Sequence, residues 1–102
     1  MDRLALLRTV VAQKPTEPFP RYGLAMELRK LGRLGEANAA FAELMGLHPG
    51  YVPAYLMAGN TLIQSGDPEG ARAVFDRGIA AATAAGDDHA RSELLGARDG
   101  LP

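Results

Sequence analysis

The sequence contains no cysteine and no tryptophan, and only 6% of its residues are aromatic. Without cysteine, a disulfide framework, a thiolate metal site and a cysteine nucleophile are all excluded. Neither sign of charge dominates. The formal net charge of −1 gives no reason to expect binding to nucleic acid or to a membrane. The longest apolar run near the amino terminus, Leu4 to Leu7, is too short for a secretory signal or a membrane span, so we expect a cytoplasmic protein.

The residues that are present predict one helical domain. The chain has 102 residues, of which 47% are apolar, and this is enough for a single core. Its charges are unevenly spread: basic residues outnumber acidic ones within 1–33, and the reverse holds within 34–102. This asymmetry could orient an acidic partner, or a head-to-tail contact between two copies of the chain. The alternative is that the charges are solvated and scattered by chance.

The chain repeats itself at an offset of 34 residues. The matching pairs are Pro15 and Pro49, Leu28 and Leu62, Gly32 and Gly66, Ala37 and Ala71, and Phe41 and Phe75. A fixed period of this length is typical of architectures built from stacked repeats. Proteins built from stacked repeats usually bind other protein chains and rarely catalyse reactions, so the offset also favours a binding function.

Apolar residues at helical spacing, bounded by glycine and proline, predict a helix in each part of the chain. The expected helices are 2–13, 20–31, 35–47, 53–65, 68–85 and 88–98. In the second of these helices, Leu24, Leu28 and Leu31 form the expected buried stripe. Asp67 and Asp87 are expected to cap the helices that follow them, because a carboxylate there accepts a free backbone N–H.

These residues resemble the tetratricopeptide repeat family, in which two antiparallel helices recur about every 34 residues. The first matching unit supplies Leu24, Ala25, Leu28, Gly32, Ala37, Phe41 and Pro49, and the second supplies Tyr55, Ala58, Gly59, Leu62, Gly66, Ala71 and Phe75. The resemblance implies an all-α fold, a right-handed superhelical stack of antiparallel helix pairs with about six helices. Small residues would allow close helix contacts, and the phenylalanines would fill the space between repeats.

The same resemblance divides the single domain into a partial repeat helix (1–17), two full repeats (18–51 and 52–85), and a capping helix with a tail (86–102). The chain departs from the family pattern in three places. Arg21 occupies a position that usually holds a large apolar residue, and the second unit lacks its closing proline. In the last helix the apolar stripe is shifted to Ala90, Leu94 and Ala97.

The resemblance implies a non-enzymatic module that binds a peptide or partner protein on its concave face, which the first helix of each pair lines. The residues predicted to form this groove are Tyr22, Met26, Arg29, Lys30, Leu56, Asn60, Ile63 and Gln64. Its apolar members would anchor side chains, its amides would bond a peptide backbone, and its bases would meet acidic side chains. Alternatively, the first and last helices cover this face.

A second functional hypothesis is self-assembly into a homodimer, because an incomplete seal at the amino-terminal end would leave apolar surface for another copy. No cofactor or metal is expected. His48 and His89 are far apart and lack ligand spacing. Asp87 and Asp88 are better explained as residues at a helix start. No glycine-rich phosphate loop follows a strand, so nothing in the sequence favours an enzyme.

Overall fold

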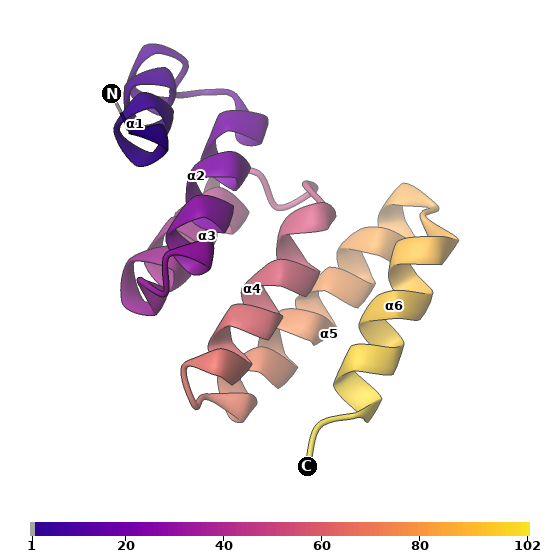
Figure 1. Cartoon of the computed structure of the whole chain (residues 1–102). Helices are drawn as coiled ribbons and strands as arrows, with labels where there is room; N and C mark the ends of the chain where they lie inside the picture. Colours follow the sequence, from indigo (N-terminus) through magenta and orange to yellow (C-terminus); the bar gives the residue numbers. More distant parts are fainter. Residues whose placement is uncertain (1) are drawn as a thin grey trace.

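The structure is a computed structural model that describes residues 2–102, and within this range every regular element is an α-helix. The helices are α1 (Arg3–Gln13), α2 (Pro18–Lys30), α3 (Leu34–Leu47), α4 (Pro53–Gln64), α5 (Pro68–Ala85) and α6 (Asp88–Asp99). Each packs against the next one along the chain, and α6 also contacts α4 (Figure 1). The result is a slab of 40 × 29 × 19 Å. The prediction of an all-α stack of helix pairs is confirmed.

The turns between paired helices follow the glycines of the repeat. Gly32 ends α2 with a φ of 75°, and Gly66 ends α4 with a φ of 83°. This left-handed conformation costs little only for glycine, which lets the chain reverse directly after each helix. At the end of α5, Gly86 has a φ of 68° and ends the helix where the second unit has no proline.

Side-chain caps start the helices that follow the turns at Gly66 and Gly86. The Asp67 carboxylate accepts a hydrogen bond from the Gly70 N–H at 2.9 Å. The Asp87 carboxylate accepts one from the Ala90 N–H at 3.0 Å. Both bonds satisfy N–H groups that have no partner within the helix. The predicted capping roles of the two aspartates are therefore confirmed.

Two details of α2 differ from the sequence-based expectation. The helix begins at Pro18 rather than at residue 20, because prolines are tolerated in a first turn whose N–H groups have no helical acceptor. Leu31 was expected in the buried stripe, but this was wrong, since 52% of it is exposed. It is the C-cap residue of α2, so its side chain lies beyond the last packed turn.

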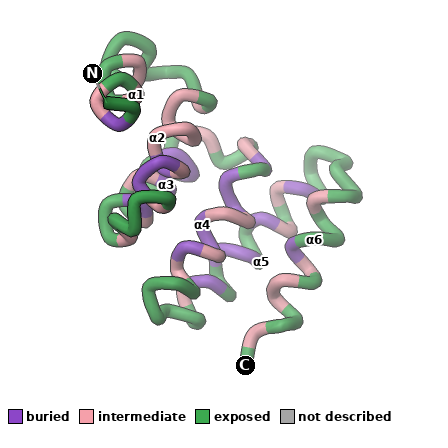
Figure 2. The backbone as a smooth tube through the Cα atoms, in the orientation of Figure 1, coloured by how far each residue is buried: buried purple, intermediate pink, exposed green. Residues whose placement is uncertain are grey.

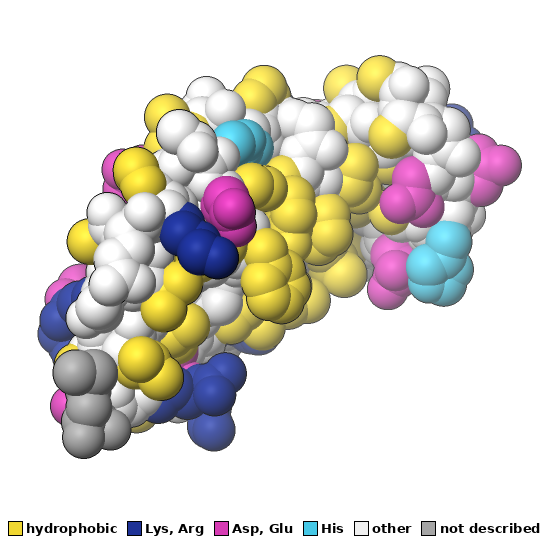
Figure 3. Space-filling view, turned by 90° about the horizontal axis from the view of Figure 1, so that it is seen from above, with side chains coloured by type: hydrophobic (Ala, Val, Ile, Leu, Met, Phe, Trp, Pro, Cys, Tyr) yellow, Lys and Arg dark blue, Asp and Glu magenta, His cyan; other side chains and the backbone are white. Residues whose placement is uncertain are grey.

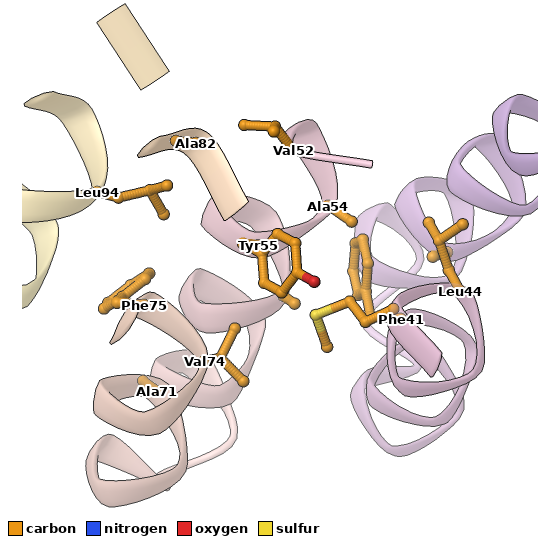
Figure 4. Packing of buried hydrophobic residues seen from close by; sticks show 13 residues of the cluster. Phe41, Leu44, Val52, Ala54, Tyr55, Ala71, Val74, Phe75, Ala82 and Leu94 are labelled. Atoms are coloured by element: carbon orange, nitrogen blue, oxygen red, sulfur yellow. The ribbon is translucent and has the colours of Figure 1, made fainter. Parts of the chain in front are cut away.

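The main core runs from α2 to α6 and is built on the two phenylalanines of the repeat (Figure 2). Phe41 is 1% exposed and Phe75 is fully buried. Figure 4 shows Tyr55 between the helix that carries Phe41 and the helix that carries Leu94. A second, smaller cluster joins Leu4 of α1 to α2 and α3. The buried residues therefore form two clusters, which meet at the partly buried Ala40 of α3.

Glycines allow the closest helix contacts. A Cβ on Gly59 of α4 would overlap the ring of Phe75 of α5. A Cβ on Gly78 of α5 would come within 2.5 Å of the Tyr55 Cβ and 3.1 Å of a Leu94 methyl group. Because these neighbours are buried, they have no free space into which to move. The predicted close-contact role of Gly59 is confirmed.

Candidate functional site

Two hollows lie on the surface that α2 and α4 share, which we call the groove face. The first has a volume of about 720 Å³ and lies against α1, α2 and the end of α4. The second, of about 290 Å³, lies between α2, α4 and α6. Tyr22 lines both hollows. In Figure 3 hydrophobic side chains gather over the middle of the molecule, next to a notch whose α6 side carries acidic side chains and a histidine.

Tyr22 is held in place by other aromatic rings. Its ring centroid lies 5.6 Å from that of Tyr51 and 6.4 Å from that of Phe41, with the Phe41 ring edge-on. Partial burial, and then the neighbouring Tyr51, raise the pKa of the Tyr22 phenol above its ordinary value. The phenol is therefore neutral at physiological pH. Tyr22 brings both an apolar ring and a neutral hydroxyl to the place where the two hollows meet.

Two of the predicted polar residues of the groove, Arg29 and Gln64, contact each other. The Arg29 Nε donates to the Gln64 Oε1 at 2.7 Å, and a second guanidinium nitrogen approaches the Met57 sulfur at 3.6 Å. This hydrogen bond joins α2 to α4. It also fixes the direction of the guanidinium group, which the spacing of residues within each helix could not predict.

The structure brings most of the predicted groove residues together. The first hollow is lined by Tyr22, Met26, Arg29, Lys30 and Gln64. Leu56 lines the second hollow. Asn60 and Ile63 line neither hollow, although Ile63 is 42% exposed. The terminal helices form the edges of the face: Arg3 of α1 contributes to the first hollow and His89 of α6 to the second.

The ends of the groove face differ in charge. Arg3, Arg29, Lys30 and Glu27 line the first hollow, and the Arg3 Nε lies 2.9 Å from the Glu27 carboxylate. Asp87 and Glu93 line the second hollow together with His89, whose Nε2 lies 3.2 Å from the Glu93 carboxylate. Basic residues therefore outnumber acidic ones at one end, and carboxylates mark the other.

Two features of the described residues bear on what the groove face can offer a ligand. Within residues 2–102, no three His, Asp or Glu side chains converge where a metal ion could be held. In the same range, no helix combines the length and the hydropathy that crossing a bilayer requires. The chemistry available on the groove face is apolar contact, hydrogen bonding and charge.

Comparison with known proteins identifies the fold. A family model for the tetratricopeptide repeat matches residues 28–92, which is more than half of the chain. The chain belongs to the tetratricopeptide repeat (TPR) family. TPR domains are generally protein-interaction modules without catalytic activity. No match was found among curated proteins.

Solved structures agree with the family match. A TPR domain protein from Salinibacter ruber, solved by NMR, is 33% identical, with 82% of this chain and 85% of that chain covered and a TM-score of 0.78. A crystal structure of a TPR domain protein from the same organism is 33% identical, covering 80% and 91% with a TM-score of 0.75. A protein from Bordetella parapertussis, solved in solution, is 25% identical, covering 97% and 86% with a TM-score of 0.81.

The TPR register explains how Arg21 fits a position that usually holds a large apolar residue. Its equivalent in the next repeat is Tyr55, whose hydroxyl donates to the carbonyl oxygen of Pro49 at 2.5 Å. Arg21 donates to the carbonyl oxygen of Pro15, which lies the same number of residues upstream, at 3.0 and 3.1 Å. It also lies 3.1 Å from the Glu43 carboxylate. Arg21 and Tyr55 therefore make the same kind of contact: each side chain donates to the carbonyl oxygen of a proline in the loop before its own helix.

The TPR register also accounts for the groove residues that the sequence analysis missed. In α6 the stripe that faces the core is shifted by one residue, and Leu94, 1% exposed, takes the central place. This rotation brings His89 and Glu93 to the second hollow. Adding the repeat length to Leu56 and Asn60 gives Ala90 and Leu94, which also line that hollow. Applying the 34-residue offset to the groove residues of α4 would therefore have predicted that the groove continues onto α6.

Proposed function

We propose that this TPR domain binds an extended peptide segment of a partner protein on the groove face, without catalysis. The observation that carries the proposal is the position of Tyr22, a ring packed on two others and shared by both hollows. A rigid aromatic platform loses little conformational entropy when a ligand is bound. Leu56 and Met57 on one side and Met26 on the other add apolar surface next to it.

Truncating two apolar side chains on either side of Tyr22 tests this proposal. Peptides would first be selected from a random library on the wild-type domain. We expect the double variant Met26→Ala with Leu56→Ala to bind them at least about tenfold more weakly in a fluorescence anisotropy titration, because two anchor contacts are lost. Leu47→Ala is the control, since Leu47 is 53% exposed and lies outside both hollows. Equal affinities for the double variant and the control would reject the groove.

Self-association through the amino-terminal end is a second candidate function. It is favoured by two apolar side chains exposed near α1, Leu6 at 53% and Phe19 at 71%. Sedimentation velocity at low and high concentration measures it directly. If this candidate is correct, a dimer forms that Leu6→Glu with Phe19→Glu converts to monomer. A wild-type domain that sediments as a monomer at all concentrations would contradict it.

A further inference from the structure

The two hollows adjoin at Tyr22 and are lined by charged residues of opposite sign. Because Tyr22 lines both of them, a ligand that crosses its ring contacts both. An extended peptide of ten residues is about 33 Å long, and the long axis of the molecule measures 40 Å. A single short segment can therefore reach both ends of the groove face.

At the first hollow, Arg29 and Lys30 make no ion pair with a carboxylate in residues 2–102. The Arg29 hydrogen bond to Gln64 uses a neutral acceptor, so the positive charge of Arg29 is not neutralised. Arg3 is already paired with Glu27. Two cations at this end are therefore available to a carboxylate ligand.

At the second hollow, Asp87 and Glu93 face the surface between α4 and α6. Asp87 accepts a helix-capping bond from a backbone N–H, which leaves its negative charge without a cationic partner among the described residues. Glu93 contacts His89, an imidazole that is exposed and easily displaced. Leu56, Met57 and Leu94 line the same hollow, and apolar surface beside a carboxylate strengthens its attraction for an incoming cation by lowering the local dielectric constant.

We propose that the groove face selects a peptide whose two ends carry opposite charges, with acidic side chains at Arg29 and Lys30, apolar ones across Tyr22, and basic ones at Asp87 and Glu93. The opposed charges fix the direction in which the segment lies, because the reversed orientation would place like charges together at both ends. This inference rests on the proposed binding function and adds the chemistry of the ligand to it.

Three fluorescein-labelled peptides of ten residues test the inference. All share a central leucine-rich stretch. The bipolar peptide carries aspartates at one end and lysines at the other, the doubly acidic peptide carries aspartates at both ends, and the uncharged peptide carries serines. We expect the bipolar peptide to bind best at low salt, with an advantage that shrinks as the salt concentration rises.

Charge reversals in the protein identify the groups responsible. Lys30→Glu and Glu93→Lys should each weaken binding of the bipolar peptide by about three- to tenfold, since a reversal removes an attraction and adds a repulsion. Glu93→Lys should also strengthen binding of the doubly acidic peptide. The matched controls are Arg91→Glu and Glu17→Lys, which change the net charge equally at exposed residues outside both hollows.

The possible failures are distinguishable. If all three peptides bind equally well and compete with library-selected peptides, or if the reversals act no more strongly than their controls, the charge assignment is overturned while the groove remains. If neither these peptides nor library-selected ones are affected by Met26→Ala with Leu56→Ala, the proposed function fails as well. A bipolar preference that Glu93→Lys transfers to the doubly acidic peptide supports the inference.

Discussion

Truncation of Phe75 to alanine should lower the free energy of unfolding by about 3–5 kcal/mol. The Phe75 side chain is fully buried, lies against Gly59 of α4, and belongs to the main core cluster. The ring fills the space between α4 and α5, so its removal leaves a cavity that the surrounding helices could close only by shifting toward one another. Urea denaturation followed by circular dichroism measures the change.

Phe19→Ala provides the matched control for this prediction. Phe19 is 71% exposed, so its truncation should change stability by less than about 0.5 kcal/mol. If Phe75→Ala is unfolded without denaturant, Phe75→Leu retains most of the volume and should give a smaller, measurable loss. Similar losses for the alanine variants of Phe19 and Phe75 would contradict the packing described here.

Adding a single methyl group at Gly59 should destabilise the domain by about 1–3 kcal/mol. Its Cβ would overlap the Phe75 ring, with the Cζ at 2.6 Å and the Cδ1 at 2.7 Å. The ring is enclosed, so α4 and α5 must separate or the ring must leave its preferred rotamer. Replacing glycine by alanine within a helix would otherwise stabilise it by nearly 1 kcal/mol, and the clash has to exceed that gain.

Gly96→Ala is the same chemical change at a site with free space. Beyond the adjacent residues and the local backbone of its own helix, no atom lies within 4 Å of a Cβ at Gly96, which is exposed within α6. This variant should therefore be more stable than wild type by about 0.5–1 kcal/mol. The two alanine variants are thus expected to shift the urea midpoint in opposite directions. Shifts of the same sign would show that α4 and α5 are not in close contact at Gly59.

The repeat offset made most of the fold predictable. Gly32, Gly66 and Asp67 determine where helices end or begin. They act through the conformation of the local backbone, which can be predicted from the sequence alone. The packing of Phe41 and Phe75 followed because both recur at the same register. Leu31 was wrongly assigned to the buried stripe of α2 because the apolar spacing continues beyond the end of the helix. The turn at Gly32 determines which residue is the last to pack against the neighbouring helices.

The groove was predictable only in part. Tyr22, Met26 and Leu56 were found from helical spacing within each repeat, once the family resemblance had assigned the first helix of each pair to the concave side. The hydrogen bond between Arg29 and Gln64 was not, because it depends on the side-chain conformations of residues 35 positions apart in the sequence. The acidic end was missed because the last helix, whose shifted stripe at Leu94 was predicted, was interpreted only as a cap and its neighbouring residues Glu93 and His89 were not added to the groove.

The central claim is that an extended peptide lies along α2 and α4 across Tyr22, and backbone amide chemical shifts on titration with a selected peptide test it most directly. The largest shifts are expected on residues that line the two hollows, with intermolecular nuclear Overhauser contacts to the Tyr22 ring. Shifts confined to α1, or to the outer surface of α3 and α5, would contradict it.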